Sequence, residues 1–229
     1  MTEAQKQRLE QQLWNIANEL RGKMDADEFR DYILGFIFFK YLSEKQHIYA
    51  NKLLETESVK DYVNLTDEED IAAIKEESLH KLGYFLRPNE LFSAITKRGN
   101  ADVEGDSNFI LEDLQAILNS IEQSTMGTES EDDFNKLFED LDLGSTKLGR
   151  SVEARNSLIA RVLSHLNKID FALGKVDSDV LGDAYEYLIA QFASGAGKKA
   201  GEFYTPQHVS KILAKIVTLD KPRIKSAYD

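Results

Sequence analysis

Residues 195–209 read Gly195-Ala196-Gly197-Lys198-Lys199-Ala200-Gly201-Glu202-Phe203-Tyr204-Thr205-Pro206-Gln207-His208-Val209. The glycines permit backbone conformations that a Cβ atom would forbid, so the loop can approach a ligand closely. Phe203 and Tyr204 add two flat faces, and Thr205-Pro206 predicts a helix start with Thr205 as the N-cap. A glycine loop, an aromatic pair and a helix N-terminus are the ingredients of a site for an anion and a ring. A glycine loop before a helix is also ordinary punctuation between elements.

The helix expected after Pro206 is amphipathic. Its apolar residues recur at helical spacing: Val209, Ile212, Leu213, Ile216 and Val217. Residues 223–228 then alternate in the manner of a β-strand. One strand is not stable alone, so this strand would need partners.

Two runs of residues carry a resemblance to a known family. Residues 201–206, Gly-Glu-Phe-Tyr-Thr-Pro, with 183–188, Asp-Ala-Tyr-Glu-Tyr-Leu, resemble the cofactor-contacting motif of adenine-specific DNA methyltransferases. The likeness is greatest to the modification (M) subunit of type I restriction–modification systems. Residues 13–22, Leu-Trp-Asn-Ile-Ala-Asn-Glu-Leu-Arg-Gly, resemble the start of the helical domain of that subunit. The two matches stand in the family's order, and together they extend the resemblance over essentially the whole chain.

The resemblance implies a mainly α fold in two parts. Residues 1–170 would form an N-terminal helical bundle domain. Residues 171–229 would be the opening helices and first strand of a truncated α/β S-adenosylmethionine-dependent methyltransferase domain. The full-length family member would transfer a methyl group from S-adenosylmethionine to adenine in a specific DNA sequence. Its expected partners are DNA, the specificity (S) subunit, a second M subunit and, further, the restriction (R) subunit.

The resemblance also assigns the cofactor-binding residues: Glu202, Phe203, Tyr204, Thr205, Pro206 and Gln207. The two rings would pack near the adenine or the sulfonium of S-adenosylmethionine, where cation–π attraction is available. Thr205 and the amides behind it would face the carboxylate of the cofactor at the helix N-terminus.

No catalytic residue is expected within this chain. The family polarises and stacks the flipped base with an Asn-Pro-Pro-aromatic loop. The chain has three prolines, Pro88, Pro206 and Pro222, and none are adjacent. We therefore expect the 229-residue chain to be inactive by itself.

Composition narrows the remaining possibilities. Cysteine is absent, which excludes disulfides and thiolate metal sites, and the four histidines show no ligand-like spacing, so no metal is expected. The net charge of −12 disfavours general nucleic-acid binding, so any DNA-binding surface would be local or supplied by a partner. We expect no membrane span and no secretory signal, hence a cytoplasmic protein.

Apolar periodicity predicts a succession of helices. The longest runs from about Glu28 into the fifties and has little polar face, so it should be the buried centre of the bundle, with Trp14 packed against it. Thr66 is expected to cap the next helix, which stops near Gly83. The segment 125–142 is acidic and broken by Gly127, with a weak helix around residues 134–138. Taken alone it predicts a solvated connector, whereas the resemblance places it within the helical domain. Further helices are expected over 2–20, 88–99, 109–121, 152–169, 177–192 and 206–217.

Three other interpretations stay open. The chain could act as a non-catalytic helical assembly module that contacts DNA or a specificity subunit. It could be an unrelated helical scaffold whose glycine loop is only a connector. It could also begin a fused restriction–modification enzyme with the same N-terminal arrangement.

Overall fold

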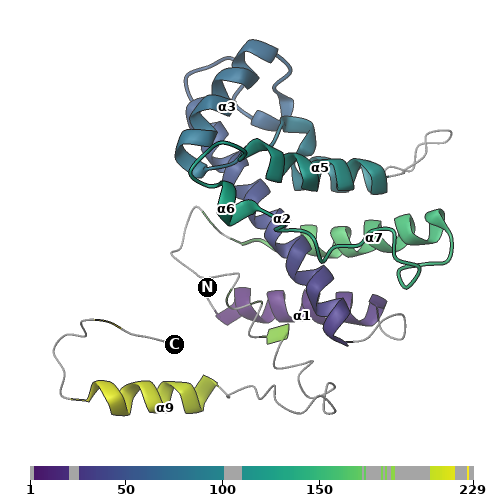
Figure 1. The fold of residues 1–229 in the computed structure, drawn as a ribbon, viewed down its shortest axis with the longest axis vertical. Coiled ribbons are helices and arrows are strands. Elements are labelled where there is room, and N and C mark those ends of the chain that lie inside the picture. Colours follow the sequence, from purple (N-terminus) through teal and green to yellow (C-terminus); the bar gives the residue numbers. More distant parts are fainter. Residues whose placement is uncertain are drawn as a thin grey trace.

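The structure is a computed structural model. It describes residues 3–20, 26–100, 110–171, 173, 182, 184, 187–188, 207–219 and 226. In these residues the fold is helical, as the sequence predicts (Figure 1). The elements, with η for a 3-10 helix, are α1 Glu3–Leu20, α2 Ala26–Leu53, η1 Tyr62–Asn64, α3 Glu68–Leu82, η2 Pro88–Glu90, α4 Phe92–Gly99, α5 Leu111–Ser124, α6 Glu131–Phe134, α7 Val152–Asn167 and α9 Gln207–Thr218. The strand expected over 223–228 lies outside the described residues, apart from residue 226.

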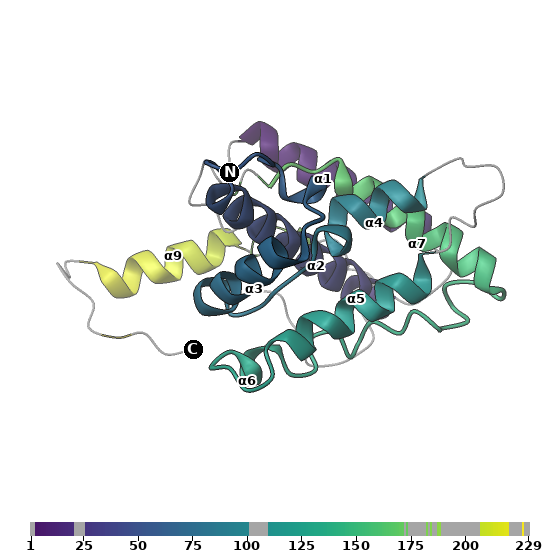
Figure 2. The same ribbon diagram turned by 90° about the horizontal axis from the view of Figure 1, so that it is seen from above.

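Helix α2 is the axis of the helical domain. Its 28 residues give it a length of about 42 Å, and it contacts α1, α3, α4 and α7. In both ribbon views α1 and α7 lie beside its first half and α3 lies beside its second half (Figures 1 and 2). Phe36, Ile37 and Phe39 are fully buried, so the prediction of a buried central helix is confirmed.

Buried polar side chains form hydrogen bonds that fix the positions of the neighbouring segments along α2. The Ser43 hydroxyl accepts a hydrogen bond from the backbone N–H of Phe92 (2.7 Å). The Gln46 amide donates to the Ser78 hydroxyl (2.8 Å), and the Tyr84 hydroxyl donates to a backbone carbonyl of α2 (2.7 Å). All of these side chains are buried, where an unmade hydrogen bond is costly. These bonds therefore specify the packing of α3 and α4 on α2 as well as stabilising it.

Helix ends follow capping chemistry, with one correction. The N-cap of α3 is Asp67, whose carboxylate accepts hydrogen bonds from two backbone amides of the first turn, and Thr66 is not the cap. Aspartate is at least as good an N-cap as threonine, and its charge also suits the helix dipole. Gly83 ends α3 at φ 84°, a left-handed conformation that glycine adopts without strain, as expected.

The acidic segment 125–142 is more than a solvated connector. Phe138, Leu141 and Leu143 are buried, although the acidic residues around them are exposed. The Tyr32 hydroxyl donates a hydrogen bond to the carbonyl of Asp142 (2.6 Å), which ties the segment to α2. The high charge of the segment concealed an apolar inner face.

The helical core extends beyond residue 170. Phe171, Ala184 and Leu188 are fully buried in the same apolar cluster as α1 and α2. Residues 182, 184, 187 and 188 are helical, within the helix expected over 177–192. Trp14 is 38% exposed, so most of its side chain is covered, and its expected packing on α2 stays a prediction. The described helices include none with the length and apolarity needed to cross a bilayer.

Candidate functional site

The predicted cofactor corner falls almost wholly outside the described residues. Glu202, Phe203, Tyr204, Thr205 and Pro206 are not described, and Gln207 is given as the first residue of α9. The corner therefore stays a prediction from the sequence.

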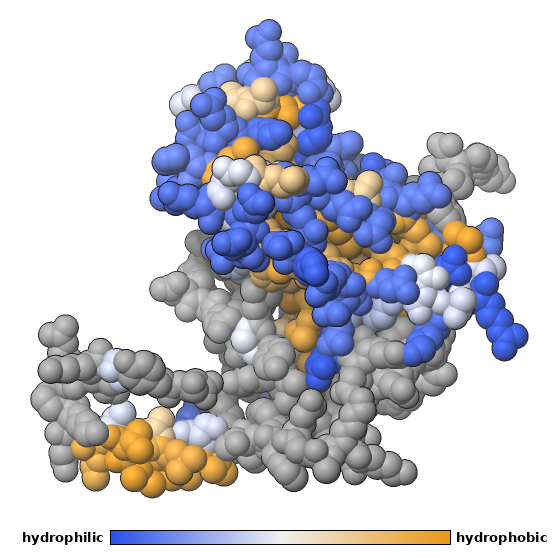
Figure 3. All heavy atoms as spheres, viewed as in Figure 1, coloured by the Kyte–Doolittle hydropathy of each residue, from blue (hydrophilic) through white to orange (hydrophobic). Residues whose placement is uncertain are grey.

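Helix α9, which follows this corner, is an amphipathic helix with an uncovered apolar face. Ile212 and Ile216 are 57% and 63% exposed, and the adjoining apolar residues are similarly open: Val209, Leu213, Val217 and Leu219. In the space-filling view these side chains form an apolar surface on α9, which lies apart from the helical domain (Figure 3). A contiguous apolar patch of this kind marks a surface that another element covers.

A buried ion pair lies beside Phe171. Lys40 of α2 is 3% exposed, and its ammonium pairs with the carboxylate of Glu44 one turn further on. The same ammonium lies 4.8 Å from the ring centre of Phe171 and 5.5 Å from that of Phe92. Burial raises the pKa of Glu44, against the opposing attraction of Lys40, and the nearby Asp170 raises it further. Lys40 thus joins α2, α4 and the start of the segment that leads to α9.

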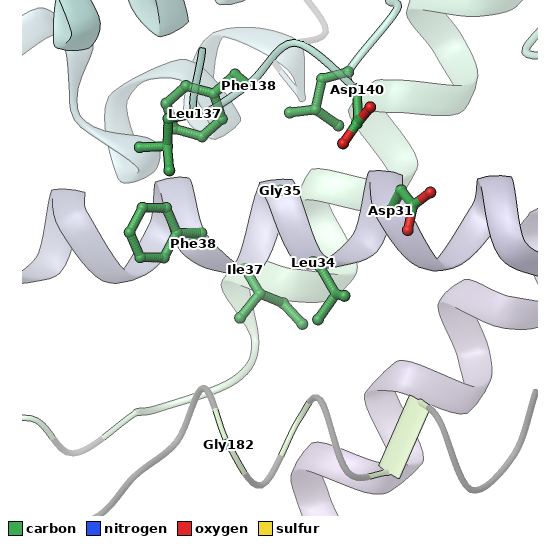
Figure 4. A pocket seen from close by; sticks show the side chains of 10 residues that line it. Asp31, Leu34, Gly35, Ile37, Phe38, Leu137, Phe138, Asp140 and Gly182 are labelled. Carbon is green, nitrogen blue, oxygen red and sulfur yellow. The ribbon is translucent and has the colours of Figure 1, made fainter. Parts of the chain in front are cut away.

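A groove of about 490 Å³ runs along one flank of α2. On one side it is bounded by Leu137, Phe138 and Asp140 of the acidic segment, and on the other by Gly182 (Figure 4). The remaining lining residues come from α2 and from Leu141: Asp31, Leu34, Gly35, Ile37, Phe38 and Leu141. Apart from the two aspartates, the lining residues that the structure describes are apolar side chains and glycines.

Gly35 sets the depth of this groove. A Cβ atom built on Gly35 would lie 2.6 Å from a methyl carbon of Leu141, closer than real carbon contacts. The missing side chain lets the acidic segment approach α2 closely at this point.

A histidine–aspartate pair organises the turn after α2. Nε2 of His47 lies 2.7 Å from the carboxylate of Asp61, and the Asn51 amide lies 3.1 Å from the same ring nitrogen. The carbonyl oxygen of Asn51 accepts a hydrogen bond from the backbone N–H of Tyr62 (2.7 Å). The bond from His47 lowers the pKa of Asp61. The pair is half exposed and holds η1 on α2, which is a structural role.

The described residues contain no cluster of three or more His, Asp or Glu side chains suited to a metal ion. Sequence reasoning missed both Lys40–Glu44 and the groove. Two signals were available: a lysine four residues before a glutamate inside an apolar run, and a glycine in the middle of that same helix. Both interrupt the pattern of a purely structural core helix.

The comparisons with known proteins agree with the helical architecture and with the order of the motifs. A family model described as the HsdM N-terminal domain matches residues 9–166, and one described as N-6 DNA methylase matches residues 176–229. The methylase subunit of the type I restriction enzyme MpnII from Mycoplasma pneumoniae is 36% identical over 98% of this chain, which spans 42% of that protein. The MjaVIII methylase subunit from Methanocaldococcus jannaschii is 32% identical over 85% of this chain, against 30% of its own length.

A solved structure of a related protein shows the same similarity in the fold. The crystal structure of the type I restriction–modification methyltransferase subunit from Streptococcus thermophilus superposes with a TM-score of 0.76 at 39% identity, covering 94% of this chain and 44% of that one. The chain thus spans less than half the length of the proteins it matches. Since the helical-domain model covers most of the sequence, the chain belongs to the HsdM family and corresponds to an N-terminal portion of a type I restriction–modification methylase subunit.

Proposed function

We propose that this chain forms the helical domain and the opening of the catalytic domain of a DNA methyltransferase that transfers a methyl group from S-adenosylmethionine to adenine. The observation that carries the proposal is the succession of two family matches, the helical domain at 9–166 and the N-6 DNA methylase at 176–229. The complete protein would act on DNA with a specificity subunit and a second methylase subunit. A restriction subunit is a further partner, and the setting is the cytoplasm.

The domain boundary is placed between residues 170 and 171. The two family matches fall on either side of it, which supports the placement. Ala184 and Leu188, which follow the proposed boundary, are buried in the helical core. Because the first helix after the boundary is anchored in the helical core, the helical domain would fix the orientation of the catalytic domain. Lys40, whose ammonium lies against the ring of Phe171, would hold the chain in place at the proposed boundary.

S-adenosylmethionine would bind at residues 202–207. Phe203 and Tyr204 would lie against the adenine ring or the sulfonium, and Thr205 with the first amides of the following helix would face the carboxylate. The exposed apolar face of α9 supports a larger catalytic domain, since helices that flank an α/β sheet bury one stripe against it. The residues here hold and orient the cofactor. The base-flipping loop would come from beyond them, so the 229-residue chain would not methylate DNA.

The test is a calorimetric titration of S-adenosylmethionine into two proteins, this chain and the product of the full open reading frame. We expect saturable binding by the long protein only. Tyr204→Ala should abolish that binding, while Tyr84→Phe, a conservative change in the helical core, should leave it intact. If the long protein fails to bind the cofactor even with DNA and the specificity subunit present, the methyltransferase assignment is wrong.

The alternative is that this chain serves only in assembly. The observation in its favour is the acidic character of the helical domain, which suits contact with a basic protein better than contact with DNA. The same titration separates the two functions. A purely assembling chain would tolerate Tyr204→Ala in the long protein, and its effects would instead map to the surface of the helices.

A further inference from the structure

We propose that the groove along α2 is a docking site for a basic, apolar helix of a partner protein. The inference does not depend on the proposed cofactor site. It rests on the shape of the groove, on the chemistry of its lining and on the charge of the segment that forms its wall.

The lining of the groove suits apolar side chains. Leu34, Phe38 and Leu137 line the groove and are partly exposed. In the close-up Leu137 lies on the acidic-segment side of α2, and Leu34 points toward the side of Gly182 (Figure 4). Along α2 the lining runs from Asp31 to Phe38, which is about 10 Å at 1.5 Å per residue. This length matches two turns of a helix that presents apolar residues at i, i+3 or i+4, and i+7.

The polar groups of the lining favour a positively charged side chain on the ligand. The described lining holds two polar side chains, Asp31, which is half-buried, and Asp140, which is exposed. Asp31 already contacts its neighbour Arg30 at 3.1 Å, so Asp140 offers the more accessible carboxylate. Among the residues that the structure describes, the lining contains no hydrogen-bond donor side chain and no buried polar side chain that could orient a small polar ligand. A ligand that places a lysine or arginine beside an apolar residue would match both the carboxylate and the apolar lining of the groove.

The acidic segment that forms one wall of the groove adds to this preference for a basic ligand. Between residues 129 and 142 the chain carries seven acidic residues and one basic residue, Lys136. Lys136 pairs with Glu139 at 3.7 Å and so offsets one of these charges, which leaves the wall strongly negative. The resulting negative field would steer a basic segment toward the groove and disfavour an acidic one.

A basic apolar helix of known sequence provides a probe. The peptide of residues 207–218, Gln-His-Val-Ser-Lys-Ile-Leu-Ala-Lys-Ile-Val-Thr, has the required stripe with lysines beside it. We would label it and follow its fluorescence anisotropy as the full 229-residue chain is added. We expect saturable binding, weakened at least about tenfold when both peptide lysines are replaced by glutamate.

Variants of the chain locate the binding. Asp140→Lys should weaken binding of the peptide at least about tenfold, because it replaces the accessible carboxylate by a like charge. Asp132→Lys is the matched control, because Asp132 is likewise exposed but lies in α6, outside the described groove lining. It makes the same charge change in the general field alone, so it should weaken binding by clearly less than Asp140→Lys. Leu137→Ser tests the apolar wall and should also weaken binding.

Three results would overturn the proposal. Without saturation up to millimolar peptide, the groove is not a docking site for such helices. If Asp140→Lys and Asp132→Lys weaken binding equally, the peptide binds through general charge and not in the groove. If sedimentation shows that the chain forms a dimer, which Asp140→Lys dissociates, the occupant is α9 of a second copy and not a separate partner.

Discussion

The buried pair Lys40–Glu44 should be a net cost to the stability of the helical domain. The lysine is 3% exposed and the glutamate side chain 29% exposed, so both charges lose hydration when the domain folds. The pKa of Glu44 is raised even though Lys40 lies beside it, which means that desolvation outweighs the attraction. Replacing a buried ion pair by apolar residues of similar volume is often stabilising, by about 1 to 4 kcal/mol. Because Glu44 keeps partial contact with water, the lower end of this range applies.

We therefore expect the double variant Lys40→Met/Glu44→Leu to be more stable than the unmodified chain by about 1 kcal/mol at pH 7. This corresponds to a rise in melting temperature of about 2 to 4 °C for a domain of this size. Lys40→Met alone should be destabilising, because it leaves the carboxylate buried without its partner. Chemical unfolding monitored by circular dichroism gives the four free energies of the double-mutant cycle.

The pH dependence of the unfolding free energy provides an independent test of the effect of Glu44. A carboxyl whose pKa is raised on folding stabilises the fold fully below its unfolded value, 4.5 for Glu44, and loses that contribution as pH rises through the folded pKa. The double variant has no such group, so its advantage over the unmodified chain should grow between pH 4 and pH 7. If the double variant is less stable than the unmodified chain by about 1 kcal/mol or more, the pair contributes net stability and this reasoning is wrong.

Three further predictions concern the same domain. Gly35→Ala should fail to give the gain of about 1 kcal/mol expected inside a helix and should instead destabilise by about 1 kcal/mol, because its Cβ atom would overlap Leu141; an increase in the denaturant midpoint would contradict the tight approach. Tyr62→Phe should cost about 1 to 2 kcal/mol in the same assay, because the buried hydroxyl donates a 2.7 Å hydrogen bond to a carbonyl that would be left unsatisfied; a neutral result would show that water replaces the bond. The pKa of Asp61 is lowered by His47, so the stability from this pair is present above about pH 4 and is lost as pH falls through the folded pKa; Asp61→Asn should remove this acid sensitivity, and an unchanged acid limb in the unfolding profile would refute it.

The helices of the N-terminal domain were predictable because their signals are local. Apolar spacing of 3.6 residues, an acidic or hydroxyl residue at the start and Gly83 at the end each act within one or two turns of chain. The central position of α2 followed from the same information, since a helix without a polar face is stable only when others surround it. The cap of α3 moved by one residue to Asp67 because two adjacent residues could each accept the same amides.

What the sequence did not reveal depends on contacts between distant segments. The acidic segment 125–142 looked solvated, because its charges outnumber its apolar residues, although Phe138 and Leu141 point into the core. The groove arises where that segment meets α2, more than a hundred residues away in sequence, as the Tyr32 to Asp142 hydrogen bond shows. No local pattern encodes such a pairing. The residues of the cofactor corner, in contrast, were singled out from resemblance and stay predictions.

The two unusual surfaces of the chain call for different partners. The exposed face of α9 is apolar along its length and lies within the N-6 DNA methylase match, so further parts of that domain are its natural cover. The groove on α2 lies within the helical-domain match, and carboxylates interrupt its apolar lining. A surface meant for permanent burial in a domain core rarely carries carboxylates, because their desolvation is costly. The aspartates at its rim therefore favour an exchangeable contact, in which a basic helix docks on a domain that is already folded.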